Sequence, residues 1–464
     1  MESTENTDLF GRRLTRREAL ERGGAAALGL TLGGSLLSAC DIGGGDGDGG
    51  GGEVVLWTEH TQPELGAMRK MITAYNKETD SKAKVVAVTG SETDIAKLTA
   101  AVRGGTGPDV YLLDRFTAAQ RAEQGILEEL TDFMEKDDGV ESFKDQYLEF
   151  AWAEVEFEGK PYGLPFDTDA RGLWHNKDLL KKSGVDPAEL DPAKGPPTVD
   201  KVREIARKVD KKDGGAYTQV GFIPWTDQGW HYTWGFAFGG DFYDESGCKV
   251  TPTDPGVVAG FQFLYDWAKE MGPKQAMAFL SAHAQCTGPQ TCNFTTPQES
   301  WPFLRGIVGM DVSGDWPINW MRQYGKGIDW GVTYIPVPEE GAESATWAGG
   351  WSVVIPKGAK NAEGAWELMK WFAGPEGQRS YSEQTSHLPT VKSLLEDQSL
   401  FDKNHQFFRK LLDVAHSRPP LPVGALYWDE LTVALEAVAL NRKQPQEALE
   451  QVAARVQPQL DKFC

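Results

Sequence analysis

The sequence predicts an α/β fold, because short apolar runs alternate with segments whose apolar residues recur at helical spacing. Apolar runs lie at 54–57, 85–88 and 109–113. Between them, 65–75 and 95–102 carry apolar residues three and four positions apart, the period of an amphipathic helix. Strands that alternate with such helices pair in parallel through crossovers, which is the α/β arrangement.

The same alternation continues along the chain. Helical patterns are predicted at 199–209, at 255–271 and at 365–372, where the apolar stripe stops at Gly-Pro. The run 353–355 predicts another strand. The last region, 428–460, is helical with a break at Gln-Pro, and no solenoid-type repeat is present.

The N-terminal residues have the features of a bacterial export signal. Arg12-Arg13 and Arg16-Arg17 precede an uncharged run at 23–39 that is short for a membrane span and rich in glycine. The stretch 15–20 resembles the twin-arginine signal, and Leu37-Ser38-Ala39-Cys40 resembles the lipobox of bacterial lipoproteins. We predict a cleaved signal over residues 1–39 and a lipidated Cys40; the alternative is an ordinary signal peptide with a chance cysteine.

The segment after the lipobox predicts a tether. Residues 41–52 are almost wholly glycine and aspartate, a composition with no side chains to bury. No second long apolar run follows, so the prediction is contact with the membrane only through the lipid anchor, outside the cytoplasm. The net charge of −21 repels phosphate backbones, which argues against nucleic acid as a partner.

Four cysteines lie beyond the lipobox and predict disulfides rather than a metal site. Four cysteines outside the cytoplasm have three possible connectivities. Cys286 and Cys292 enclose a turn-forming stretch, so we favour a bridge there and a second between Cys248 and Cys464. A metal site is the weaker alternative, because the spacing is not CxxC and His283 is the only imidazole nearby.

Several motifs occur in a fixed order from about residue 53 to residue 460. They are Gly-Thr-Gly-Pro-Asp-Val at 105–110, Leu-Trp-His-Asn-Lys-Asp-Leu at 173–179, and the stretch 348–358 from Ala-Gly-Gly-Trp to Ile-Pro-Lys-Gly. Together they resemble the extracellular solute-binding proteins of sugar ABC importers, the maltose-binding-like family. The resemblance implies a type II periplasmic-binding-protein-like fold, in which hinge segments join two α/β lobes that close over a ligand.

The resemblance also implies a domain division and a set of partners. We expect lobe 1 over 53–164 and 352–405, and lobe 2 over 165–351 and 406–464. The implied function is capture of a small ligand, a sugar, for importer permease subunits by a monomer without enzymatic activity, cofactor or metal.

Aromatic residues are the first group of candidate ligand contacts. A sugar ring has an apolar face and a rim of hydroxyls, so its site needs flat aromatic platforms bordered by polar groups. Trp225, Trp230 and Trp234 lie in a glycine-rich stretch where a loop is expected. By resemblance Trp316 corresponds to a stacking tryptophan, and Trp351 and Tyr427 are further candidates, whereas Trp152, Trp267, Trp366 and Trp371 fit core positions.

Polar candidates follow the predicted strands, at the edge where open α/β sheets bind ligands. A carboxylate there is equally a surface charge or a helix cap. The candidates of this group are Trp57, Glu59, His60, Glu92, Asp114, Arg115, Asp167, Asp241 and Gly350.

Two alternatives remain open at the level of sequence. The same fold could bind a glycerophosphodiester, which would need basic residues in the cleft, where only Arg115 and Arg171 are expected. A glycoside hydrolase would use a carboxylate pair such as Asp167 with Asp169, or Glu154 with Glu156.

Overall fold

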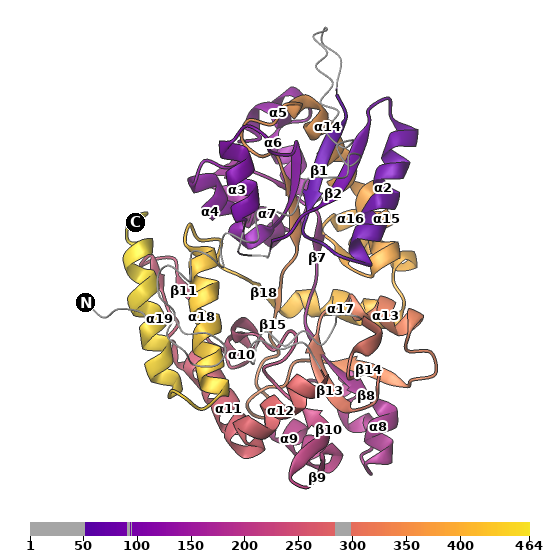
Figure 1. The fold of residues 1–464 in the computed structure, drawn as a ribbon, viewed down its shortest axis with the longest axis vertical. Coiled ribbons are helices and arrows are strands. Elements are labelled where there is room, and N and C mark those ends of the chain that lie inside the picture. The colour runs from indigo at the N-terminus through magenta and orange to yellow at the C-terminus, as the bar shows by residue number, and fades with distance from the viewer. Residues whose placement is uncertain (1–51, 91–92, 94, 284–297) are drawn as a thin grey trace, which may run out of the picture. The chain divides into compact units, whose positions relative to one another are not determined.

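Two five-stranded β-sheets organise the part of the chain that this computed structural model describes, residues 52–90, 93, 95–283 and 298–464. The first sheet has the strand order β2-β1-β3-β16-β6, and the second has the order β14-β8-β13-β10-β9. In Figure 1 the first sheet and its helices occupy the upper half of the view, and the second sheet lies in the lower half.

The first sheet contains the strands predicted at the start of the chain. Its core strands β1, β2 and β3 are parallel, and β16 runs antiparallel to both β3 and β6. The expected helices connect the parallel strands. The bounds are β1 (Val54–Thr58), α2 (Glu64–Glu78), β2 (Ala83–Ala87), α3 (Ala96–Arg103), β3 (Val110–Asp114), β6 (Leu164–Pro165) and β16 (Trp351–Val354).

Both faces of the first sheet are buried, as the continuous apolar run in β3 requires. Val110 and Leu112 pack into one core, with residues of α2, α14 (Ala362–Ala373) and α15 (Pro375–Thr385). Tyr111 and Leu113 point to the opposite face and join a smaller cluster with α3. The alternation of side chains along a strand therefore places helices on both faces.

The second sheet belongs to a separate, larger core. Strands β10 and β13 are parallel, whereas β8 runs antiparallel to both β13 and β14. The bounds are β8 (Gly172–Asn176), β9 (Lys211–Asp213), β10 (Ala216–Phe222), β13 (Val308–Ser313) and β14 (Trp330–Thr333).

Local signals set the helix ends in this half of the chain. Helix α9 (Val199–Val209) has the predicted bounds, because the Thr198 hydroxyl caps it by accepting from the Lys201 amide at 3.1 Å. Helix α11 (Pro255–Met271) also matches, with Asp254 as its cap. In α9 the apolar stripe is buried as expected, at Val199, Val202, Ile205, Ala206 and Val209.

The C-terminal region forms two helices, α18 (Gly424–Ala439) and α19 (Pro445–Leu460). The second helix begins at the proline of the predicted Gln-Pro break. Both pack against α11. A disulfide joins Cys248 to Cys464, the pairing expected for these two residues. The expected Cys286–Cys292 bridge and the lipidation site Cys40 lie outside the described residues.

Three stretches of chain pass between the two sheets. The first runs through β7 (Asp167–Thr168), the second joins β15 (Thr346–Ala348) to β16, and the third contains β17 (Leu388–Pro389). Strand β17 pairs with β7. Strand β16 begins at Trp351, one residue before the position at which lobe 1 was expected to resume. Helix α17 (Lys403–Leu411) contacts β14 of the second sheet.

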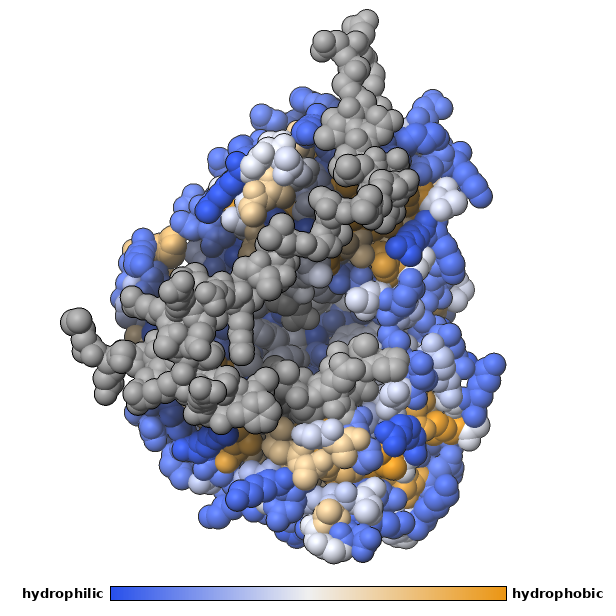
Figure 2. Space-filling view, viewed as in Figure 1, coloured by the Kyte–Doolittle hydropathy of each residue, from blue (hydrophilic) through white to orange (hydrophobic). Residues whose placement is uncertain are grey.

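The remaining elements cover the two sheets or form short hairpins. Among the described residues, no helix is both long and apolar enough to cross a membrane. Outside the grey atoms, the face shown in Figure 2 is mainly hydrophilic. The bounds are α4 (Ala118–Glu123), α5 (Thr131–Lys136), α6 (Val140–Gln146), α7 (Glu149–Ala153), β4 (Glu156–Phe157), β5 (Lys160–Pro161), α8 (Lys177–Lys182), α10 (His231–Ala237), β11 (Tyr243–Asp244), β12 (Lys249–Val250), α12 (Pro273–His283), α13 (Pro317–Gln323), α16 (Lys392–Glu396) and β18 (Ala415–Ser417).

Candidate functional site

A cavity of about 670 Å³ is lined by residues from both sheets and from the segments that cross between them. Of the residues that the structure describes, six indoles and two imidazoles contribute to its lining, together with four carboxylates and two guanidinium groups. The first sheet contributes residues that follow β1 and the last residue of β3, and the second contributes residues that follow β10 and β13. This is the carboxyl edge of the parallel strands, where ligands bind in open α/β sheets.

The six tryptophans of the lining divide into two groups by exposure. Trp230, Trp316 and Trp351 are partly exposed. Trp320, Trp347 and Trp428 line the same cavity but are buried behind other side chains. Only the first group presents substantial indole surface to a ligand.

Trp316 is positioned by the sharp turn between β13 and α13. It is the residue before Pro317, which starts the helix. Its six-membered ring lies against Gly314 so closely that a Cβ there would be 2.0 Å from the ring. The indole also stacks on the His387 ring, with centroids 5.7 Å apart. Gly314 therefore creates the space in which this indole lies.

Trp351 and Trp230 are held from different elements. The Trp351 amide donates to Asp167 Oδ1 at 2.7 Å, and its ring contacts the edge of His60 at 4.4 Å between centroids. Trp230 precedes α10 and packs against Trp428 of α18, with centroids 5.0 Å apart. The three partly exposed indoles thus come from two sheets and three separate segments.

Arg171 lies flat on one buried indole. Its guanidinium carbon is 3.3 Å from the centroid of Trp347, a cation–π contact. The same group forms an ion pair with Asp169 and donates to Gln228 Oε1 at 3.1 and 3.2 Å. Burial opposes ionisation of Asp169, but Arg171 holds the pKa of that carboxyl below its usual value.

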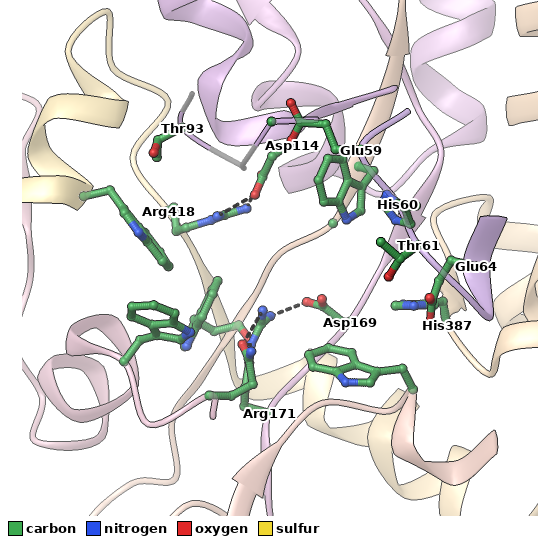
Figure 3. Close-up of a pocket in the computed structure, with 18 of the residues that line it drawn as sticks. Glu59, His60, Thr61, Glu64, Thr93, Asp114, Asp169, Arg171, His387 and Arg418 are labelled. Carbon is green, nitrogen blue, oxygen red and sulfur yellow. Dashed lines mark hydrogen bonds and ion pairs between the residues drawn. The ribbon is translucent and has the colours of Figure 1, made fainter. Parts of the chain in front are cut away.

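Arg418 makes the second guanidinium pair of the cavity. It donates to both oxygens of Asp114, at 2.6 and 3.1 Å, in the bidentate geometry that suits a carboxylate. Its guanidinium carbon lies 4.0 Å from the centroid of Phe116. Figure 3 shows both ion pairs at the cavity, with Arg418 on the side opposite Glu64 and His387.

The lining carries more negative than positive charge. Glu59, Glu64, Asp114 and Asp169 face two arginines, and each arginine already has its own aspartate. Glu59 accepts a hydrogen bond from the Tyr111 hydroxyl at 2.6 Å. Burial raises the pKa of Glu64 to about 7. Among the described residues, no group of three or more His, Cys, Asp or Glu is placed to hold a metal ion.

Seven of the predicted site residues line this cavity: Glu59, His60, Asp114, Trp230, Trp316, Gly350 and Trp351. Glu92 lies outside the described residues. Asp241 is exposed and lines a different cavity, beside Asp244 and Asp254. Trp57 points to the outer face of the first sheet, where it packs with the α3 cluster and beneath Lys97.

Three predicted aromatic contacts are core residues instead. Trp225, Trp234 and Tyr427 are 1%, 0% and 1% exposed and belong to the core of the second sheet. The Trp234 indole donates to the Pro224 carbonyl at 2.7 Å, and the Tyr427 hydroxyl donates to the Phe242 carbonyl at 2.9 Å. The expected loop is present at Trp225, but Trp234 lies in α10, so the loop prediction was wrong there; Tyr427 lies in α18.

Arg115 and Asp167 hold the crossing segments together rather than line the cavity. Arg115 is fully buried and pairs with Glu154 at 2.9 Å. It also donates to the carbonyls of Asp167 and Gly349, on the first and second crossings. The carboxylate pairs considered for hydrolysis are thereby engaged in structural contacts, since Glu154 binds Arg115 and Asp169 binds Arg171.

Arg418, His387 and Glu64 line the cavity and were not predicted. Arg418 and His387 lie on irregular segments of the C-terminal third that have no periodic pattern to place them. Glu64 is the first residue of α2 and has the sequence signature of an ordinary acidic first turn. The later crossings of the chain bring Arg418 and His387 to the cavity, whereas Glu64 lies there because it follows β1.

The family model for bacterial extracellular solute-binding proteins matches residues 60–379. This chain belongs to that family. Members are substrate-binding proteins of ABC transporters and not enzymes, so the hydrolase alternative is set aside. The fold of this solute-binding protein is the two-domain, maltose-binding-protein-like arrangement.

Relatives and solved structures support the same assignment. This solute-binding protein is 26% identical to the galactooligosaccharide-binding protein of Bacillus subtilis over 426 residues, which covers 88% of this chain and 90% of that one. It is 23% identical to the maltotriose-binding protein of Pyrococcus abyssi over 403 residues, 85% of this chain and 79% of that one.

The solved structure of CpMnBP1 with mannotriose bound is similar, with a TM-score of 0.75 and 25% identity over 87% of this chain and 99% of that one. Maltose-bound MalE3 of T. maritima shares the fold, with a TM-score of 0.67 and 23% identity over 89% of this chain and 100% of that one.

Proposed function

We propose that this protein is the lipid-anchored ligand-binding subunit of an ABC importer and that its ligand is a neutral oligosaccharide. The observation that carries the proposal is the set of three partly exposed indoles, Trp230, Trp316 and Trp351, around one cavity. Indole faces suit the apolar faces of sugar rings, and the surrounding carboxylates and amides suit their hydroxyls.

The energies are of the right size for this ligand. A stacked sugar face that hides ~100 Å² of apolar surface contributes on the order of 2.5 kcal/mol. Micromolar affinity corresponds to about 8 kcal/mol. Three stacking faces with a hydrogen-bonding rim supply that amount and still offset ligand desolvation and the ordering of the site, whereas one face does not.

The charges of the cavity favour a neutral ligand over a phosphodiester. An anionic ligand needs cationic or amide donors that its site has not already paired. Both arginines of the lining are bonded to aspartates, and Glu59 adds negative charge. The names of the relatives, which bind galactooligosaccharide and maltotriose, point in the same direction.

The ligand is tested by calorimetry and thermal shift on the purified chain from Gly51 to Cys464. The panel contains galacto-, manno- and malto-oligosaccharides and glycerophosphodiesters. We expect one oligosaccharide series to raise the melting temperature and to bind at micromolar or lower concentration. Binding of a glycerophosphodiester but of no saccharide would overturn the carbohydrate assignment and leave family membership intact.

The anchor is tested separately in the full chain. We expect the wild-type protein to remain with the membrane fraction of the producing bacterium and to carry acyl chains. The Cys40→Ser variant has no thiol to acylate, so it should be exported and released. Equal membrane retention of both proteins would contradict the lipid anchor.

A further inference from the structure

One histidine at the cavity wall lies between two buried carboxylates. His387 Nδ1 is 3.8 Å from Asp167 Oδ2 and 3.7 Å from Asp315 Oδ1. The three residues come from different segments: Asp167 from the first crossing, His387 from the third, and Asp315 from the turn that follows β13. We call these three residues the proton triad.

The two carboxylates cannot turn away from the histidine. Asp167 Oδ1 accepts from the Trp351 amide at 2.7 Å, and Asp315 Oδ2 accepts from the Leu388 amide at 3.2 Å. These bonds fix the remaining oxygens, Asp167 Oδ2 and Asp315 Oδ1, toward His387. Both remaining oxygens are buried and have no hydrogen-bond partner within the described part of the chain. Such groups are costly unless a proton or cation satisfies them.

The imidazole is equally constrained. Its ring lies between Trp316 and Tyr381, with centroids 5.7 and 5.5 Å away and planes nearly parallel to it. His387 is 8% exposed and lines the ligand cavity beside Glu64 (Figure 3). A ligand that stacks on Trp316 therefore lies next to this ring.

Among the described residues, the two arginines nearest the triad are each paired with another carboxylate. Arg171 binds Asp169, and Arg115 binds Glu154. The neighbouring histidines are His60 and His405; burial lowers the pKa of each, that of His60 to about 3, so both are neutral at pH 7. The other titratable groups that face the triad, Asp114, Asp169, Glu64 and Tyr381, carry negative charge or none.

Two buried carboxylates with no cation of their own do not both ionise at neutral pH. Burial raises the pKa of Asp167 to about 8 and that of Asp315 well above its usual value. Burial also lowers the pKa of His387 to about 4. These directions agree with the geometry, in which the triad retains protons that isolated carboxyl groups would lose at pH 7.

We propose that Asp167, His387 and Asp315 form a proton-binding site coupled to the ligand cavity, so that ligand binding takes up a proton. The proposal rests on the proposed function, since it needs a ligand that covers Trp316. Such a ligand displaces the remaining water from His387, and this makes ionisation of the adjacent carboxyls more costly.

The expected pH dependence follows because the triad binds its proton more tightly in the ligand-bound protein than in the free protein. The free protein releases the proton near pH 8, and the bound protein releases it at a higher pH. Affinity is therefore full below about pH 7 and falls as the pH rises through the interval between the two pKa values. The dissociation constant rises by up to tenfold per pH unit in that interval.

The test is isothermal titration calorimetry at pH 6, 7, 8 and 9 with the galacto-, manno- or malto-oligosaccharide that binds most tightly in the panel described above. Two buffers with different ionisation enthalpies are used at each pH, and the difference gives the protons taken up per ligand. We expect uptake at pH 8 and above in the wild-type protein and its loss in Asp167→Asn, which removes the carboxyl that titrates near pH 8. Asp315→Asn resembles the protonated form of Asp315 and should retain the uptake. Each asparagine keeps an oxygen for the amide bond that fixes the side chain.

Asp311→Asn is the matched control. Asp311 is also a buried carboxylate of β13 with a raised pKa, but its Oδ2 accepts from the Trp301 indole at 3.0 Å and it does not line the cavity. This variant should retain proton uptake. Saccharide binding with no proton uptake at pH 8 and 9, or equal loss of uptake in the control, would overturn the inference and leave the proposed function standing.

If no saccharide binds at any pH, the proposed function fails and the triad is tested without ligand. A carboxyl whose pKa is raised in the folded protein stabilises it fully at low pH, and this stability is lost as the pH rises through the raised value. The wild-type urea midpoint should therefore fall relative to that of Asp315→Asn between pH 5 and pH 8. A difference between the two midpoints that stays constant with pH would contradict the proton-binding site as well.

Discussion

Water reaches only some of the tryptophan faces at the ligand cavity, and this decides what each residue does. Trp316 rests on Gly314 and leaves part of its indole exposed, whereas the face of Trp347 is covered by Arg171. A covered indole already has its stacking partner and contributes to the wall. An exposed indole gains from a ligand the burial that it lacks in the free protein.

Replacing Trp316 with alanine should weaken saccharide binding about 50- to 100-fold, because the lost stack is worth ~2.5 kcal/mol. Titration calorimetry measures the change. Trp371→Ala is the control, since Trp371 lies on α14, donates to Glu78 at 3.0 Å and is outside the cavity lining. Equal losses in both variants would show that the effect is one of stability and not of stacking.

Arg115 contributes to the stability of the fold rather than to ligand binding. Replacing it with methionine leaves Glu154 buried without its charge partner, which should lower the free energy of unfolding by about 3–5 kcal/mol. Urea denaturation measures this. Arg207→Met removes an exposed pair with Glu270 and should change the midpoint little. A small effect of Arg115→Met would mean that Glu154 finds water or a proton instead.

Among the elements, the three crossing segments carry the geometry of the site. Strand β16 starts directly after Gly350, whose φ of +127° is a conformation that other residues rarely adopt. The Asp167 carbonyl and the Arg115 guanidinium lie close to Gly350, so the crossings meet where no side chain fits. The position of Trp351 at the cavity depends on this contact.

Gly350→Ala should therefore destabilise the protein strongly, since its Cβ would lie 2.3 Å from the Asp167 carbonyl oxygen. Gly358→Ala is matched in backbone type, with φ of +77° and no atom within 4 Å of its Cβ, so it should cost only about 1 kcal/mol of strain. Thermal unfolding compares the two. Equal melting temperatures of the two variants would mean that the crossing segments can move apart without loss of stability.

At the scale of the whole molecule, the C-terminal end is tied back to the second half of the fold. The disulfide joins Cys248, beside β12, to Cys464, the last residue, across a separation of 216 residues. Neither cysteine lines the ligand cavity. The bridge therefore bears on stability, while the cavity depends on the crossings.

Removal of this bridge in Cys248→Ser/Cys464→Ser should lower stability by about 2–5 kcal/mol, because a long loop is released in the unfolded chain. Differential scanning calorimetry with and without reductant measures the loss, and ligand affinity at 25 °C should stay unchanged. A fall in affinity without a fall in melting temperature would place the bridge in the binding machinery.

The order of strands and helices could be predicted from sequence because their signals are local. Helices α9 and α11 were predicted to the residue, since a cap and an apolar stripe lie within the same short segment. Four strands of the first sheet, β1, β2, β3 and β16, also followed from apolar runs, whereas the short β6 was not predicted. The lining was predicted only in part, because Trp225 and Trp230 lie five residues apart in similar surroundings, yet one is core and the other lines the cavity.

The α/β class, the family resemblance and the carboxyl edge where Glu59 and Asp114 lie could all be predicted without coordinates, because each rests on short runs and motifs that can be recognised one at a time along the chain. The tertiary structure alone decided that Arg418 meets Asp114, that His387 lies between Asp167 and Asp315, and that Arg115 supports the crossings. Those contacts join residues separated by up to about three hundred positions, and their partners are chosen by the paths of three crossing segments, which no local pattern encodes.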